Sequence, residues 1–396
     1  MSISVSISVG GRFHAFDLAR EMQKRGHLKR LITSYPRFKA REWGLPNDKV
    51  ESILSHELIC RGMGLIAIPA SIRRELQFRM HNRFDRLAAK RIPPGTEVFT
   101  GWSGMSLNCL LRAKSLGAKT VLERGSAHIR TQNRLLAEGY RRAGYPWAGI
   151  HEGGMAREVE EYRLADLIAV PSQFARQTFL DEGVPADKIV VNPYGCDLSV
   201  FRPGRKEDKV FRVIHCGQIS LQKGAHLLVQ AFLELDLPNS ELWMIGAPTA
   251  EMKDFLGKVH DSRIFIKGPF PQVSLPAYYA QGSVFCLATL QDGFAMVILQ
   301  ALSCGLPVIA TRNSGAPDVV EDGKSGFLVD AGNVEALKAK LQLLCENERV
   351  RLEMARYARD LRETTGKFRL SWDRYGEAMA DAYLTLLQGR CATVQS

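Results

Sequence analysis

The feature that most constrains the fold of this 396-residue chain is an alternation of short apolar runs with helical patterns. Such alternation is typical of a parallel sheet with helices on both faces. In the first half, helical patterns at 13–25 and 103–116 lie between apolar runs. These runs predict strands at residues 2–9, 28–34, 97–101, 119–123, 166–170 and 188–192.

A stretch rich in proline and charge at residues 201–209 interrupts this alternation, which then resumes. We interpret it as a linker between two Rossmann-like domains, residues 1–203 and 204–369, followed by a terminal helix within 370–396. Two such sheets facing each other enclose a cleft, and ligands bind beyond the carboxyl ends of the strands. The second half predicts strands at 211–216, 241–245, 263–266, 283–287, 307–310 and 327–329, and helices at 347–364 and 370–388.

The positive charge lies in one half of the chain. Residues 1–203 hold 31 Lys and Arg against 20 Asp and Glu. Residues 204–396 hold 22 basic and 22 acidic residues, so the whole net charge of +11 belongs to the first half. A basic half beside a neutral half implies different partners for the two.

Cysteine usage and hydropathy restrict the location and the cofactors. The eight cysteines include no CxxC pair, which argues against a zinc site and favours a reducing compartment. The first residues have no basic region before an apolar run, so they predict a strand and no signal peptide. No uncharged apolar stretch approaches the length of a membrane-spanning helix. We therefore expect a cytoplasmic protein.

The segment with the most chemical content is the turn Asp292-Gly293-Phe294-Ala295. It follows a predicted strand and opens a predicted helix, whose free N–H groups suit a diphosphate. Asp292 and Gln300 carry acceptor oxygens that suit hydroxyls on either side of the phosphates. The alternative is an ordinary strand–turn–helix in which Asp292 serves only as a helix-start residue.

Two further segments share this position after a strand. Gly217-Gln218 leads to Lys223-Gly224, where the lysine suits phosphate charge. Residues 311–318 place Pro317 at the first helical position, so the amides of 314–316 form a candidate anion nest. A solvated lysine and a plain helix cap remain the alternatives.

Together these segments resemble the family-four retaining glycosyltransferases of the GT-B fold, in order and spacing over nearly the whole chain. The resemblance implies that Asp292 contacts the donor sugar at the catalytic centre, that Gln300 binds the ribose, and that Lys223 binds the diphosphate. The donor-binding set that it implies is Gly217, Gln218, Lys223, Gly293, Phe294, Ala295, Met296, Val297 and Gln300.

The first half supports the resemblance. Its opening glycine loop looks like the family's loop near the acceptor, which implies acceptor binding by Gly10, Gly11, Arg12 and His14. Residues 371–375 are similar to the terminal helix that crosses back to the first domain in the family.

The chain also departs from the family's pattern. Gln218 replaces an arginine, Gln300 replaces a glutamate, and Asp292 replaces the usual glutamate. The histidine expected after the strand at 119–123 is missing from its usual place. Arg124 and His128 are the candidates for its catalytic role.

The predicted function is therefore transfer of a hexose from a nucleotide diphosphate sugar to a glycan or lipid-linked acceptor, with retention of configuration, in cell-surface polysaccharide or lipopolysaccharide synthesis. The chain has no Asp-x-Asp motif, so we expect no metal and no other cofactor. Two alternatives remain open: a nucleotide-sugar epimerase of the same fold, and a non-catalytic relative that only binds the nucleotide sugar.

Residues 61–91 carry eight basic and two acidic side chains. A basic amphipathic helix there predicts contact with an anionic membrane, at the inner face of the cytoplasmic membrane. Packing of the helix on its own domain is the alternative. No nucleic-acid recognition motif accompanies these charges, so we expect no nucleic-acid partner. The apolar stripe consists of Ile72, Leu76, Met80, Phe84 and Leu87.

Overall fold

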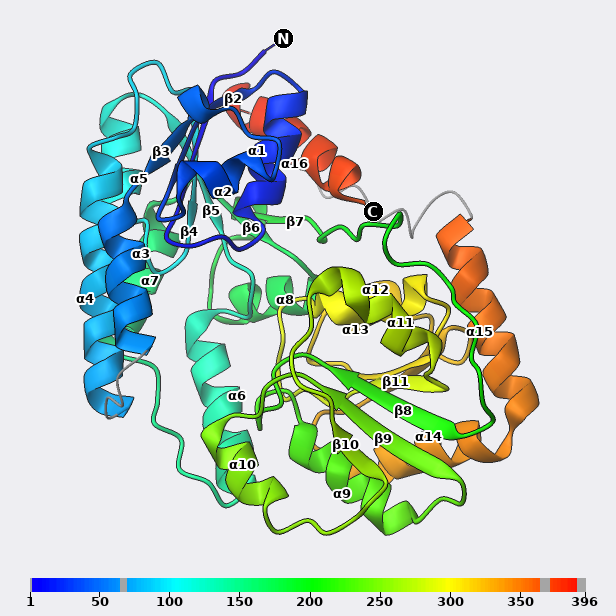
Figure 1. Ribbon diagram of the computed structural model, residues 1–396. Coiled ribbons are helices and arrows are strands. Elements are labelled where there is room, and N and C mark those ends of the chain that lie inside the picture. Colours follow the sequence, from blue (N-terminus) through cyan, green and yellow to red (C-terminus); the bar gives the residue numbers. More distant parts are fainter. Residues whose placement is uncertain (1, 65–69, 364–370, 390–396) are drawn as a thin grey trace.

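The computed structural model describes residues 2–64, 70–363 and 371–389, which form two α/β domains (Figure 1). All strand pairs in the first domain are parallel, and the strand order reverses between β1 and β4. The order across this seven-stranded sheet is β3 (Val50–Ser52), β2 (Leu28–Thr33), β1 (Val5–Val9), β4 (Val98–Trp102), β5 (Lys119–Glu123), β6 (Leu167–Val170) and β7 (Ile189–Val191).

The second domain repeats the same plan with six parallel strands. Its order reverses between β8 and β11, and each reversal leaves a crevice at the carboxyl ends of the strands, where α/β proteins bind ligands. The order across this sheet is β10 (Ile264–Ile266), β9 (Ser240–Ile245), β8 (Phe211–Cys216), β11 (Val284–Leu287), β12 (Val308–Thr311) and β13 (Gly326–Val329).

Helices cover both faces of each sheet (Figure 1). Those of the first domain are α1 (Ala15–Lys24), α2 (Arg37–Arg41), α3 (Leu54–Gly64), α4 (Ala70–Ala89), α5 (Leu107–Ser115), α6 (Ile129–Arg142), α7 (Glu152–Leu164) and α8 (Gln173–Asp181). Those of the second are α9 (Ala225–Leu235), α10 (Ala250–Leu256), α11 (Leu275–Ala280), α12 (Met296–Ser303), α13 (Ala316–Val319), α14 (Val334–Glu346) and α15 (Glu348–Glu363).

The last helix, α16 (Trp372–Leu387), returns to the first domain and lies beside α1 (Figure 1). Buried tyrosines fix it there: the hydroxyl of Tyr383 lies 2.8 Å from Oγ1 of Thr100 on β4, and Asn192 Nδ2 donates to the Tyr375 carbonyl at 3.1 Å. The predicted boundary between residues 369 and 370 lies outside the described residues.

The doubly wound α/β architecture predicted from the alternation is confirmed, and all twelve predicted strands are present. The prediction missed β3, because three residues at the edge of a sheet carry too short a pattern. Residues 201–209 contain no helix or strand, as expected for the linker.

The basic segment at 61–91 lies largely in α4, while residues 65–69 are outside the described part. Met80 and Phe84 are buried in the first domain, whereas Ile72 is 52% exposed. The second half of the apolar stripe therefore packs on its own domain. Among the described residues, no helix is long and apolar enough to cross a membrane.

Candidate functional site

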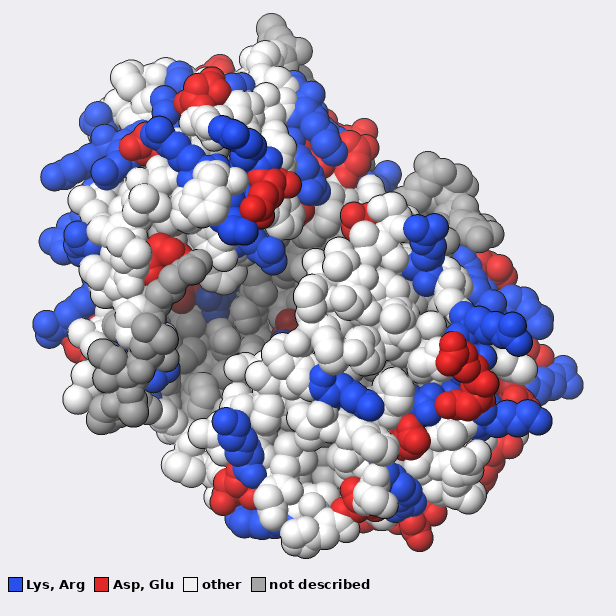
Figure 2. Space-filling model, viewed as in Figure 1, with Lys and Arg blue, Asp and Glu red and all other residues white. Residues whose placement is uncertain are grey.

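A cavity of about 920 Å³ lies where the two domains meet. Figure 2 shows the molecule hollowed between them, with Lys and Arg along the rim of the first domain. Its first-domain wall includes the loops after β1, β4, β5 and β7, and β1 and β4 flank the point where the strand order reverses. Met296 and Gln300 of α12 line it from the second domain. This is the crevice in which a doubly wound fold binds its ligand.

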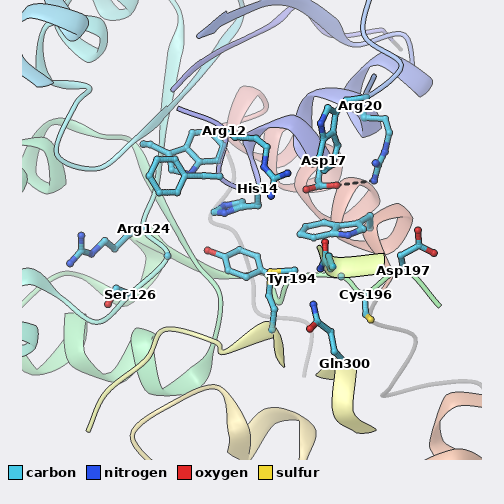
Figure 3. A pocket seen from close by; sticks show the side chains of 18 of the residues that line it. Arg12, His14, Asp17, Arg20, Arg124, Ser126, Tyr194, Cys196, Asp197 and Gln300 are labelled. Carbon is cyan, nitrogen blue, oxygen red and sulfur yellow. Dashed lines mark ion pairs between the residues drawn. The ribbon is translucent and has the colours of Figure 1, made fainter. Parts of the chain in front are cut away.

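His14 lies at the centre of the first-domain wall (Figure 3). Its ring packs between Trp102 and Tyr194, with centroid distances of 4.9 and 4.2 Å. Nε2 lies 3.3 Å from Oε2 of Glu123, and Oε1 of Glu123 accepts a 2.8 Å hydrogen bond from the Tyr375 hydroxyl. A buried carboxylate therefore fixes His14, and α16 fixes that carboxylate.

Sequence reasoning placed His14 on the acceptor side but missed Glu123 and Tyr375. Glu123 ends β5 and is 2% exposed. A charged residue at the carboxyl end of a buried strand was the available signal. No sequence signal joined it to Tyr375, which is 252 positions away.

Two polar atoms in the same wall lack partners. The indole N–H of Trp102 and the hydroxyl of Tyr194 are buried and make no hydrogen bond within the described part of the chain. Both side chains line the cavity. An unpaired buried donor costs on the order of 1–3 kcal/mol, so a ligand with hydroxyl groups would stabilise this wall.

The turn that carries Asp292 lies against the first domain. The Gly293 carbonyl accepts a 2.5 Å hydrogen bond from Ser172 Oγ, and a Cβ on Gly293 would lie 2.1 Å from the carbonyl oxygen of Gly125. Only glycine fits this approach. Ala295 follows with φ +57, a left-handed conformation that is strained for any side chain.

Asp292 itself occupies the anion position at the start of α12. Its Oδ1 accepts from the amides of Phe294 and Ala295 at 3.4 and 3.2 Å, and its Oδ2 forms an ion pair with Lys223 Nζ. Asp292 thus contacts the start of α12 in this structure, and its contact with the donor sugar stays a prediction. Lys223 and Asp292 meet, as the sequence predicted for two donor-site residues, but neither lines the cavity.

The remaining donor-site candidates divide into two groups. Gln300 is 4% exposed, lines the cavity, and lies 3.4 Å from the Tyr279 hydroxyl through Oε1. Met296 also lines it, and Val297 is half-buried beside it on α12. Gly217 and the exposed Gln218 lie in the loop after β8, outside the cavity wall.

The two candidates for the missing histidine are engaged elsewhere. Arg124 lines the cavity, but its guanidinium donates to Glu158 at 2.7 Å, to Gln132 at 2.5 Å and to the Ala127 carbonyl at 3.1 Å. These contacts leave it little capacity for a ligand.

His128 does not line the cavity. It caps α6 by accepting from the Arg130 amide at 3.4 Å, and its ring packs on Tyr162 and Phe179. Burial lowers its pKa to about 4, despite the opposing charge of Glu182. The geometry thus assigns His128 a structural position, since it follows β5 but turns toward α8.

The glycine loop predicted to bind the acceptor lines the cavity through Arg12 and His14, whereas Gly10 and Gly11 are not among the lining residues. Gly10 donates its amide to Met105 Sδ at 3.0 Å, and Gly11 has φ +126. Phe13 adopts φ +42 and is 57% exposed, so the loop holds a strained, exposed aromatic residue at the wall. This conformation turns Arg12 and His14 into the cavity.

No metal-binding cluster is apparent in the described ranges: no three His, Cys, Asp or Glu side chains are arranged to hold an ion. Metal independence stays a prediction.

Comparison with known proteins adds family information to this geometry. Residues 199–361 match the family model of group 1 glycosyl transferases. The sulfoquinovosyl transferase SQD2 of Arabidopsis thaliana is 30% identical over 215 residues, which cover 50% of this chain and 41% of that protein.

Two bacterial relatives are similar over comparable lengths. The GDP-mannose-dependent alpha-(1-6)-phosphatidylinositol monomannoside mannosyltransferase of Mycolicibacterium smegmatis is 31% identical over 197 residues, covering 44% of this chain and 51% of that protein. A D-inositol 3-phosphate glycosyltransferase of Corynebacterium urealyticum is 28% identical over 270 residues, which cover 60% of this chain and 62% of that protein. The chain thus spans about half the length of the curated relatives it matches.

Solved structures agree over almost the whole chain. Sucrose-phosphate synthase of Thermosynechococcus elongatus has a TM-score of 0.72 at 16% identity and covers 98% of this chain and 100% of its own. HepE of Anabaena, solved in complex with UDP, has a TM-score of 0.68 at 16% identity, covering 97% and 100%. These likenesses confirm the predicted GT-B fold.

Proposed function

Because residues 199–361 match the family model of group 1 glycosyl transferases and the chain has the GT-B fold, we propose that it transfers a hexose from a nucleotide diphosphate sugar to a glycan or lipid-linked acceptor. The observation that carries this proposal is the cavity at the domain boundary, where first-domain polar groups face α12. The first-domain wall suits the transferred sugar and the acceptor, and the α12 wall suits the nucleotide of the donor.

The donor diphosphate binds at Lys223 and the amino end of α12. Both groups hold the Asp292 carboxylate in this structure, so the site already accommodates an anion. The diphosphate displaces that carboxylate, and Asp292 then turns to a hydroxyl of the donor sugar. Lys223 and the helix-start amides meet the charge that develops on the leaving group without a metal.

The transferred sugar lies against His14, and the partnerless N–H of Trp102 and hydroxyl of Tyr194 bind its hydroxyl groups. Gln300 binds the ribose from the opposite wall. The acceptor hydroxyl attacks on the face that the diphosphate leaves, which retains the anomeric configuration. Similar proteins support a nucleotide donor, since one relative is GDP-mannose-dependent and HepE was solved with UDP-glucose.

Similar proteins also support the proposed acceptor class. Their names specify sulfoquinovosyl transfer, phosphatidylinositol monomannoside, D-inositol 3-phosphate and capsular polysaccharide biosynthesis. We place the reaction in glycolipid or cell-surface polysaccharide synthesis, including lipopolysaccharide, on the cytoplasmic side of the membrane.

Contact with an anionic membrane belongs to the same proposal, but on a different surface from the predicted stripe. Phe38 of α2 and Leu58 of α3 are 65% and 70% exposed, and they line one apolar groove with Arg37 and Lys39. Apolar side chains flanked by basic ones suit a lipid interface. Equal sedimentation of the protein with neutral and anionic vesicles would refute this contact.

Transfer is tested by incubating the full chain with UDP-, GDP- and ADP-sugars in the presence of a membrane extract that supplies acceptors. Release of nucleotide diphosphate that depends on the extract supports a transferase. Interconversion of the sugar without release indicates an epimerase. Donor binding with neither reaction indicates a non-catalytic binder.

A further inference from the structure

Arg12 presents an open guanidinium to the cavity from the loop after β1. It lines the cavity, is exposed, and makes no ion pair or hydrogen bond to another residue within 2–64, 70–363 and 371–389. Arg124 lines the same cavity, but its N–H groups are committed to Glu158, Gln132 and a carbonyl. Arg12 therefore has the larger free hydrogen-bonding capacity of these two cavity arginines.

A single indole fixes Arg12 beside a second guanidinium. The guanidinium carbon of Arg12 lies 5.0 Å from the centroid of the Trp43 ring, and that of Arg20 lies 5.7 Å from it. All three side chains line the cavity. Stacking on an aromatic ring restricts a long side chain before any ligand arrives, which lowers the entropy lost on binding.

Within the described part of the chain, the acidic groups nearby form no ion pair with Arg12. Figure 3 shows Asp17 between Arg12 and Arg20, and the Asp17 carboxylate pairs with Arg20 at 3.0 Å. Burial raises the pKa of Asp17 to about 6, while the nearby positive charges oppose that rise. Asp197 also lines the cavity, but its Oδ1 accepts from the amide and hydroxyl of Ser199 at 2.9 and 2.6 Å.

We propose that Arg12, with Arg20 beside it, binds a phosphate group carried by the acceptor. This inference rests on the proposed function and names the acceptor class. A planar guanidinium matches an oxyanion with two parallel hydrogen bonds. Two guanidinium groups on one indole suit a doubly charged phosphate better than a single carboxylate. Lys223, the proposed partner of the donor diphosphate, is not among the residues that line this cavity beside Arg12, and titration with UDP separates the two phosphate groups.

The test uses the full chain and two probes of matched shape, α-D-glucose 1-phosphate and methyl α-D-glucopyranoside. Titration calorimetry at low salt should show binding of the sugar phosphate and weaker binding of the uncharged sugar. Arg12→Gln should weaken sugar-phosphate binding by about tenfold or more, as for a lost hydrogen bond to a charged group. Arg112→Gln is the matched control, because Arg112 is exposed on α5 and contacts only Ser115.

A second arm separates soluble from lipid-borne phosphate. Neutral phosphatidylcholine vesicles are compared with the same vesicles containing polyprenyl phosphate. Arg12-dependent sedimentation with the second kind assigns the phosphate to a lipid-linked acceptor. Sugar-phosphate binding without such sedimentation assigns it to a soluble acceptor. Either result supports the phosphate subsite.

The proposal is overturned if Arg12→Gln binds the sugar phosphate as tightly as the unmodified chain does, or if the uncharged sugar binds equally well. It is also overturned if Arg12→Gln loses affinity for UDP alone, since Arg12 would then serve the donor. Failure of the proposed function has a different signature. The chain would bind the sugar phosphate through Arg12 and yet release no nucleotide diphosphate with any donor and acceptor.

Discussion

The two domains share one sheet topology but differ in how their ligand walls are built. The second domain presents backbone amides, one lysine and one carboxylate at a single turn and helix start. The first domain presents side chains from the loops after β1, β4, β5 and β7 and from α16, with His14 among aromatic rings. The family model matches residues 199–361, within which the short-range second-domain arrangement lies.

This difference shows that a short sequence motif can describe the ligand wall of the second domain but not that of the first. Backbone amides at a turn suit the part that all nucleotide diphosphates have in common. Side chains gathered from distant loops suit the part that differs among acceptors. The excess positive charge also lies wholly in the first half. We therefore expect changes in the second domain to alter use of any donor, and changes in the first to alter the sugar and the acceptor.

The largest effect is expected at the turn itself. Asp292→Ala should lower transfer by at least about a hundredfold, in the range known for one transition-state contact. It should not weaken UDP binding, because it removes the carboxylate that competes for Lys223. Steady-state transfer rates and UDP titration measure the two quantities. Weaker UDP binding with unchanged transfer would reverse the assigned roles.

The next effect concerns the contact between the domains. Asp318 accepts a 2.9 Å hydrogen bond from the Gln173 amide at the start of α8, and burial raises its pKa from 3.8 to about 6. A raised carboxyl pKa contributes stability that is present below about pH 4 and is lost as pH rises through about 6.

Asp318→Asn removes the charged form and keeps an acceptor for Gln173. At pH 8 it should stabilise the fold by at most about 3 kcal/mol, since one pKa unit equals about 1.4 kcal/mol. At pH 4 it should have little effect. Thermal unfolding at both pH values measures this. An equal change at both values would show that the charge of Asp318 does not govern the contact.

A smaller effect is expected in the first domain. Tyr375→Phe removes the hydroxyl that holds Glu123 and keeps the ring. It should raise the activation free energy of transfer by about 1 kcal/mol, which lowers the rate roughly fivefold. UDP affinity should not change. Tyr383→Phe is a control, because its hydroxyl bonds Thr100 rather than Glu123. Equal rate losses in the two variants would indicate a general loosening of α16.

The smallest effect concerns the strained residue before α12. Ala295→Gly removes the strain of the left-handed conformation, which stabilises the folded chain by about 1 kcal/mol. It also increases the entropy of the unfolded chain, which opposes that gain. We expect a gain of less than about 1 kcal/mol in the free energy of unfolding, measured by urea titration. A loss of stability would show that the methyl group of Ala295 contributes packing that outweighs the strain.

The sequence predicted the fold better than the site. Strand–helix alternation repeats many times, so errors at one element do not change the architecture. The pairing of Lys223 with Asp292 was foreseen as proximity, because both follow neighbouring strands of one sheet. The contact of Glu123 with Tyr375 was not foreseen, because it depends on where α16 docks.

His128 also shows that position in the sequence does not predict the direction of a side chain. It occurs near the expected place in the chain, but one turn of backbone directs its ring to Phe179 and away from the cavity. His14, from the opposite end of the domain, lies at the end of β5 instead. Position along the chain fixes the strand that a residue follows, while side-chain direction depends on tertiary packing.

The claim that the donor belongs to the second domain is tested most directly by titrating UDP into the unmodified chain, Lys223→Ala and Glu123→Gln. Loss of Lys223 should weaken binding by about 1.5–3 kcal/mol, as for a hydrogen bond to a charged group. Glu123→Gln should leave UDP affinity unchanged, because the Glu123 carboxylate contacts His14 and Tyr375 of the first-domain wall. UDP affinity that falls in Glu123→Gln and is unchanged in Lys223→Ala would contradict the assignment of the two walls.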